Sequence, residues 1–192
     1  MYGFSTIAFI TLLTPFIQLW IGNNMVIENA VIYLILLNFY IVGHATVVNN
    51  IKNAAGVFDS VKYLGIFVAI VNITVSLLFV KKFGLISVYF ATICSTLIPV
   101  FYVPIVIYRD VFATRSLNYY RDSIFYLIPV VLSVVILEYI KRSFFSATTL
   151  SGFIVLMLLV VVIPNSIFFV FCRNRVELTY IKQIVQTRLQ KK

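Results

Sequence analysis

The chain has 192 residues, of which 62% are hydrophobic and 11% charged, and its mean hydropathy is +1.06. Soluble domains carry about 25% charged residues, so the composition excludes an ordinary soluble protein. The formal charge is +9, but Lys and Arg stand singly or in pairs between apolar runs instead of gathering on a soluble module, which excludes a nucleic-acid-binding protein.

Six charge-free runs are long enough to cross the roughly 30 Å hydrocarbon core of a bilayer as helices. In chain order they are Tyr2 to Ile21, Val26 to Val48, Tyr63 to Val80, Leu85 to Tyr108, Ser123 to Ile140 and Thr149 to Cys172. The sequence therefore predicts an all-α integral membrane protein with about six transmembrane helices. Residues 1–172 form the transmembrane lobe, and residues 173–192 form a basic tail.

The basic residues predict the orientation of the lobe. Alternate loops and the tail place eleven Lys and Arg on one side, against four on the other: Lys52, Lys62, Arg109, Arg115, Arg121, Arg173, Arg175, Lys182, Arg188, Lys191 and Lys192, against Lys81, Lys82, Lys141 and Arg142. Short loops rich in Lys and Arg stay in the cytoplasm. Both termini are therefore expected there, on the simpler reading that no span is missed.

The tail has an amphipathic pattern. Ile181, Ile184, Val185 and Leu189 recur at helical spacing, and most of its basic residues fall elsewhere on the helix. Such a segment is able to lie along the anionic inner leaflet and contact membrane lipids. Anchoring of the topology is the simpler interpretation.

Polar residues inside the spans are costly in lipid unless they face protein or water. The second span contains Asn38 and His44, which lie about 240° apart around a helix and cannot share one narrow face. The third span carries a stripe of small and polar residues at Gly65, Ala69, Asn72 and Ser76. Helix packing and a transport path both explain such a stripe, and packing is the simpler explanation. The candidates for a substrate path are Asn38, His44, Asn72 and Ser76.

Catalytic and metal sites are not expected. Asp59, Asp110 and Asp122 all read as loop or boundary residues, so no pair of membrane-embedded aspartates is predicted. His44 is the sole histidine and has no carboxylate nearby in the sequence to tune it as a base. We therefore expect no catalytic residue, no metal and no cofactor, and a protein that is not an enzyme.

One acidic residue lies near the end of a predicted span. Glu138 comes shortly before Lys141 and Arg142 at the end of the fifth span. Long side chains near a helix end usually extend to the membrane surface. We therefore expect an interfacial charge cluster there and not a buried proton relay.

Several segments resemble a known family. They are PFIQLWIG at residues 15–22, NITVSLLFVKKFG at 72–84, Ala91-Thr92 and Tyr119-Tyr120. Together they look like the second half of the polysaccharide flippases of the Wzx type, whose superfamily also contains drug-exporting and lipid II-flipping branches. The block around the third span is the most specific. Ser87 departs from the pattern, since these proteins often carry a second glycine there.

This resemblance implies one lobe of a transporter with two six-helix lobes around a central cavity. The chain is expected to correspond to the C-terminal lobe and to pair with an N-terminal flippase half or a second copy. The cargo would be an undecaprenyl-diphosphate-linked oligosaccharide crossing the cytoplasmic membrane of a bacterium. Two alternatives stay open: an inactive fragment of such a flippase, and a six-span scaffold for cell-envelope synthesis.

Overall fold

A computed structural model describes residues 2–22, 28–144 and 149–173. They form six long helices: α1 (Tyr2–Trp20), α2 (Asn29–Ala54), α3 (Leu64–Phe83), α4 (Leu85–Asp110), α5 (Leu117–Phe144) and α6 (Leu150–Cys172), with a short 3-10 helix η2 (Asp59–Val61) before α3. All six are long and apolar enough to cross a membrane, and the described ranges contain no strand. The prediction of an all-α, multi-pass membrane protein is confirmed.

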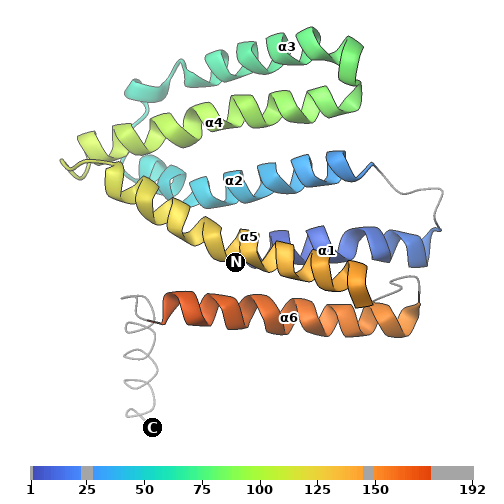
Figure 1. The fold of residues 1–192 in the computed structure, drawn as a ribbon. Helices are drawn as coiled ribbons and strands as arrows, with labels where there is room; N and C mark the ends of the chain where they lie inside the picture. Colours follow the sequence, from blue (N-terminus) through green and yellow to red (C-terminus); the bar gives the residue numbers. More distant parts are fainter. Residues whose placement is uncertain (1, 23–27, 145–148, 174–192) are drawn as a thin grey trace, which may run out of the picture.

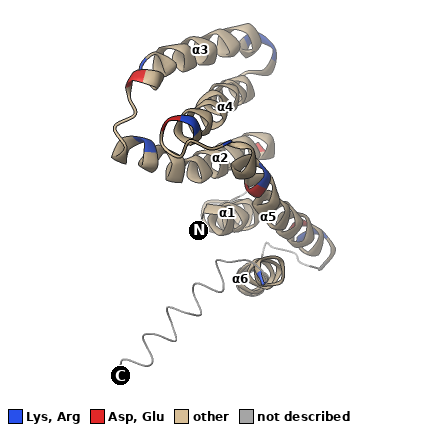
Figure 2. Ribbon diagram, turned by 90° about the vertical axis from the view of Figure 1, so that its left-hand side faces the viewer, with Lys and Arg blue, Asp and Glu red and all other residues tan. Residues whose placement is uncertain are grey.

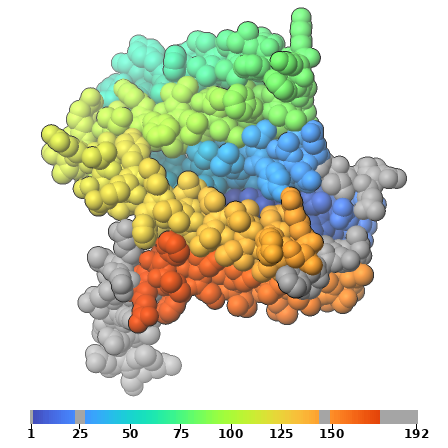
Figure 3. All heavy atoms as spheres, in the orientation of Figure 1, coloured from blue at the N-terminus to red at the C-terminus, as the bar shows by residue number. Residues whose placement is uncertain are grey.

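The helices form two groups that share α2. Helix α3 packs on α4 and α4 packs on α2, whereas α1 packs on α2, α5 and α6. Figure 1 shows α5 crossing obliquely from the end of α4 toward α6, in front of α1 and α2. The space-filling view shows the same crossing (Figure 3). Helix α5 therefore closes one side of the α1–α2 pair.

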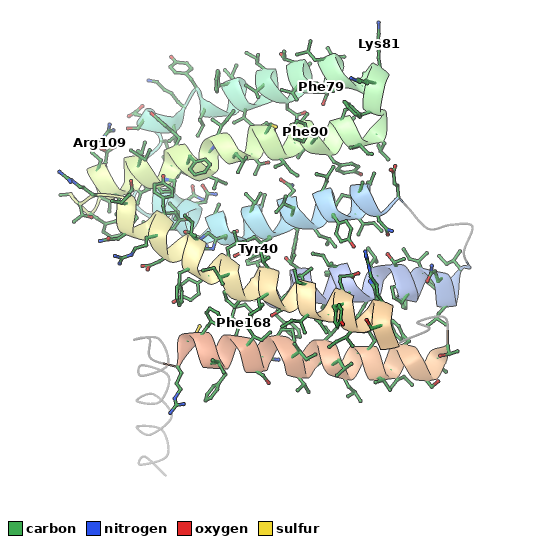
Figure 4. All side chains as sticks on the ribbon, in the orientation of Figure 1. Tyr40, Phe79, Lys81, Phe90, Arg109 and Phe168 are labelled. Carbon is green, nitrogen blue, oxygen red and sulfur yellow. The ribbon has the colours of Figure 1, made fainter. Side chains whose placement is uncertain are left out.

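Basic residues occupy the last turns of α2, α3, α4 and α5, and Figure 2 colours the described Lys and Arg blue. Lys81, at the end of α3, and Arg109, at the end of α4, are at opposite ends of the molecule in Figure 4. Five of the eleven basic residues assigned to the cytoplasmic side belong to residues 174–192, outside the described part of the chain, as does nearly all of the predicted tail. The orientation of the lobe therefore stays a prediction.

Several helix boundaries differ from the sequence prediction. Helix α2 continues six residues beyond Val48 to Ala54, and α5 begins at Leu117 instead of Ser123. Lys81, Lys82 and Phe83 belong to α3, and Gly84 alone, with φ of 55°, joins α3 to α4. A left-handed backbone favours glycine. Ending each predicted helix where its charge-free run ends makes the helix too short, because charged residues at a membrane surface remain helical.

The buried clusters follow the division of the helices into two groups, and the exposed apolar surface differs between helices. Ile7, Val130, Leu137 and Val160 form a buried cluster among α1, α5 and α6, and Val48, Val103 and Ile107 form another between α2 and α4. No residue of α3 is buried, and large apolar side chains such as Ile73 and Leu77 are exposed on it. Such an apolar surface suits contact with lipid or with another membrane chain.

Candidate functional site

One side of each of three helices carries polar residues that line two pockets. Residues three or four apart lie on one face of a helix, and these faces of α1, α2 and α5 meet. We call their meeting line the seam. It contains, in order along each helix, Gly3, Ile7, Ile10, Thr14 and Gln18 on α1; Val47, His44, Tyr40, Leu36, Tyr33 and Asn29 on α2; and Tyr119, Asp122, Tyr126, Val130, Ser133, Leu137 and Lys141 on α5.

The first pocket of the seam, here the tyrosine pocket, lies near the start of α1 and α5 and has a volume of about 530 Å³. Six aromatic side chains line it, from four helices: Tyr2, Phe4, Tyr40, Tyr119, Tyr126 and Phe168. Tyr40 on α2 and Phe168 on α6 are labelled in Figure 4. The polar side chains in its wall are His44, Asp122, Ser123 and Asn165.

A close helix contact forms part of this wall. Gly43 on α2 is buried, and a Cβ atom added to it would lie 2.2 Å from ring atoms of Tyr2 on α1. No real side chain tolerates such a distance. Glycine is therefore required here to let the Tyr2 ring lie against the backbone of α2.

His44 connects α2 to α5. Its Nε2 atom lies 2.7 Å from the hydroxyl of Ser123, and that hydroxyl donates its proton to the carbonyl oxygen of Tyr119 at 2.8 Å. A hydroxyl has one proton to donate, so Nε2 of His44 must be the donor and Ser123 the acceptor. In the neutral imidazole, Nδ1 is then left as an acceptor.

Two tyrosine rings flank the imidazole of His44. The ring centroid of Tyr40 lies 6.3 Å away, nearly parallel to the imidazole, and that of Tyr119 lies 5.9 Å away. The ring is thus held by a hydrogen bond at one edge and by aromatic contacts. Such double support fixes the orientation of His44 in the pocket.

The second pocket, here the ion-pair pocket, lies at the other end of the seam and has a volume of about 300 Å³. Glu138 and Lys141 form an ion pair, with side chains only 16% and 19% exposed. Arg142, Gln18 and Tyr33 also line the pocket. Both side chains are therefore largely covered by protein, and the position of the cluster relative to the membrane surface stays a prediction.

An apolar layer separates the two pockets. Ile7, Leu137 and Val160 are at most 1% exposed and pack together, and the nearby hydroxyls of Thr11 and Ser133 donate to carbonyl groups one turn back in their own helices. The hydroxyl protons of both side chains are thus used within their own helices, and both side chains are buried. The seam is therefore closed between its ends.

Of the four path candidates, only His44 lies in a seam pocket. Asn72 on α3 instead donates to the hydroxyls of Thr92 and Ser95 on α4, at 3.4 Å and 3.1 Å. Asn72 thus has protein partners within one helix hairpin, as the packing explanation of the stripe expects.

The remaining stripe residues and Asn38 lie apart from both pockets. Ser76 is half-buried on α3, while Gly65 and Ala69 are exposed, so the stripe does not have one common environment. Asn38 lies on another face of α2 than His44, and its buried side-chain oxygen has no hydrogen-bond partner among the described residues. The structure does not bring the four candidates together.

Sequence reasoning missed the partners of His44. Asp122 is a half-buried residue within α5 and not in a loop, and it shares a pocket with His44, which lies 78 positions earlier in the chain. The spacing of Tyr119, Asp122, Ser123 and Tyr126 was the available signal, because it places four polar side chains on one helix face. Among the described residues, no group of three or more His, Cys, Asp or Glu is arranged to hold a metal ion.

Comparisons of the chain with protein families, with curated proteins and with solved structures give no match.

Proposed function

We propose that the chain is the C-terminal lobe of a lipid-linked oligosaccharide flippase, working in the cytoplasmic membrane of a bacterium as a transporter and not as an enzyme. The observation that carries the proposal is the seam. Polar groups are costly in a membrane, yet the helices collect them into two pockets at opposite ends of the seam, with an apolar layer between. A pure scaffold has no need of such an arrangement.

The cargo is proposed from the sequence resemblance to polysaccharide flippases. An undecaprenyl-diphosphate-linked oligosaccharide has a large polar head that must cross apolar lipid, while its polyprenyl tail stays in the membrane. The ion-pair pocket carries Lys141 and Arg142 against one acid, Glu138. Its excess of positive charge favours the diphosphate at that end of the path.

The partner is proposed to be an N-terminal six-span half or a second copy of this chain. In the family that the sequence resembles, the substrate is enclosed between two lobes, and one lobe provides a single wall. The exposed apolar side chains of α3 and α4 leave surface for such a contact as well as for lipid.

Complementation tests the proposal. The chain is expressed in a flippase-deficient cell alone, and together with a matching N-terminal half, and surface polysaccharide is measured alongside the amount of each chain in the membrane. We expect export only with both halves. Export by this chain alone would overturn the lobe assignment and indicate a self-paired transporter.

Failure with both halves present in normal amounts would instead indicate an inactive remnant or a scaffold. A scaffold is then recognised by a second measurement. Deleting it would reduce the membrane association of the other polysaccharide-synthesis proteins, whereas deleting a flippase lobe leaves them in place and causes lipid-linked oligosaccharide to accumulate on the cytoplasmic side.

A further inference from the structure

The tyrosine pocket and the ion-pair pocket differ in charge. Lys141 and Arg142 line the ion-pair pocket, whereas among the described residues that line the tyrosine pocket there is no lysine or arginine and there is one carboxylate, Asp122. Arg121 pairs with Asp122 at 4.0 Å, but its side chain is 74% exposed and is not part of the pocket wall. The charge of the tyrosine pocket therefore favours a cation over an anion.

Several polar groups of the pocket can accept a hydrogen bond, beside the hydroxyls of Tyr2, Tyr40, Tyr119 and Tyr126, which can donate or accept. Ser123 uses its proton on Tyr119 and its oxygen on His44, which leaves Nδ1 of neutral His44 as an acceptor. The side-chain nitrogen of Asn165 donates one of its two protons to the carbonyl of Val161 at 2.6 Å, and its side-chain oxygen can accept. The Asp122 carboxylate accepts only.

The rest of the wall is aromatic. Six phenol and phenyl rings line a volume of about 530 Å³, which lies within the range of small-molecule sites. The faces of aromatic rings attract a cation within about 6 Å of the ring centroid. Acceptors, one carboxylate and ring faces together select a ligand that is positively charged and carries N–H donors.

We propose that the tyrosine pocket binds an organic ammonium group, with Asp122 as its counter-charge, Nδ1 of His44 and the side-chain oxygen of Asn165 as hydrogen-bond acceptors, and the tyrosine rings as the cation-binding faces. The ammonium belongs to a small free amine or to an amino sugar in the head of a lipid-linked substrate. The proposal does not depend on translocation, because the pocket lies within this one chain.

The binding test uses the purified full chain in nanodiscs of phosphatidylcholine, whose neutral surface does not concentrate cations. The probe is phenethylammonium, and its matched control is phenethyl alcohol, which has the same ring but no charge. Calorimetry should show at least about tenfold tighter binding of the ammonium, since hydrogen bonds to charged groups contribute about 1.5 to 3 kcal/mol. Equal binding of phenethylammonium and phenethyl alcohol overturns the proposal. The proposal is also overturned if neither phenethylammonium nor glucosamine, the second ammonium probe, binds.

A second pair of probes separates the two sources. Glucosamine is compared with N-acetylglucosamine, which keeps the sugar ring and loses the charge. Preferential binding of glucosamine assigns the site to an amino-sugar head group, whereas binding of phenethylammonium without glucosamine assigns it to a free amine.

Two variants locate the site. Asp122→Asn removes the counter-charge with little change of shape, and His44→Lys puts a fixed cation beside the ligand. Each should weaken phenethylammonium binding at least about tenfold, while Asp59→Asn, at a fully exposed carboxylate, should leave it unchanged. Thermal melting identifies any variant that fails to fold. Wild-type affinity in a folded Asp122→Asn protein would refute the assignment.

Discussion

Asn72 and His44 are both polar residues inside predicted spans, yet they belong to different kinds of region. Asn72 bonds to Thr92 and Ser95, which lie 20 and 23 positions away in the adjacent helix of one hairpin. His44 bonds to Ser123, 79 positions away, at the edge of a pocket built from four helices. Asn72 has its hydrogen-bond partners within its own hairpin. His44 instead links α2 to α5 at the edge of a pocket.

The free-energy cost of a polar side chain inside a membrane does not by itself identify a functional residue. The half-buried amide of Asn72, which donates to two hydroxyls on the next helix, is explained by helix packing. An imidazole that leaves one nitrogen unused by the described residues and faces a cavity has capacity for a ligand. The predictions below distinguish these two roles.

The largest effect is expected at Gly43, where the seam depends on a close helix contact. Gly43→Val should destabilise the protein by about 1 to 3 kcal/mol, because the added atoms overlap the Tyr2 ring and force α1 away from α2. The measurement is the melting temperature in detergent by size-exclusion chromatography after heating. Gly65→Ala is the control, since its Cβ meets no atom within 4 Å.

The Gly43 explanation has its own check. In a Tyr2→Ala background, the ring that obstructs the valine is gone, so Gly43→Val should cost much less than in the wild type. An equal cost in both backgrounds would show that Tyr2 is not the cause.

The Glu138–Lys141 ion pair should contribute more to the stability of the protein than an ion pair at the surface. Lys141→Ala leaves the largely covered carboxylate of Glu138 without its cation, and we expect a loss of about 1 to 3 kcal/mol. Lys62→Ala breaks the pair with Asp59, whose side chains are 56% and 102% exposed, and should cost less than about 1 kcal/mol. Thermal unfolding of both variants gives the comparison, and similar losses would remove the distinction between the two pairs.

The hairpin should show a smaller effect on stability and none on transport. Asn72→Ala removes two hydrogen bonds to α4, and interhelical hydrogen bonds in membranes average about 0.6 kcal/mol. We expect a slightly lower melting temperature and, in the complementation assay, normal export per molecule of protein. His44→Ala should instead reduce export per molecule. Reduced export per molecule in Asn72→Ala, with protein levels unchanged, would return Asn72 to the path.

Sequence patterns predicted the spans because hydrophobic length and Gly84 are local signals. They did not predict the site, because His44 and Asp122 meet only after α5 crosses the α1–α2 pair, and no local pattern reports that crossing. The low exposure of Glu138 was not predicted for the same reason: the residues of α1 and α2 that line its pocket lie more than 100 positions away. Neighbouring residues in the sequence determine whether a helix forms, whereas the seam depends on how distant helices pack together.

The central claim is that the seam is hydrated at both ends and closed in the middle. Single cysteines in a background lacking Cys94 and Cys172 test it most directly, with a membrane-impermeant thiol reagent applied to either side of sealed vesicles. Val47→Cys in the tyrosine pocket should react only from the cytoplasmic side, and Thr14→Cys in the ion-pair pocket only from the opposite side. Ser133→Cys, in the apolar layer, and Ile73→Cys, on the outer face of α3, should not react. If Val47→Cys and Thr14→Cys were as unreactive as Ile73→Cys, or Ser133→Cys reacted as fast as they do, the account of the seam would be contradicted.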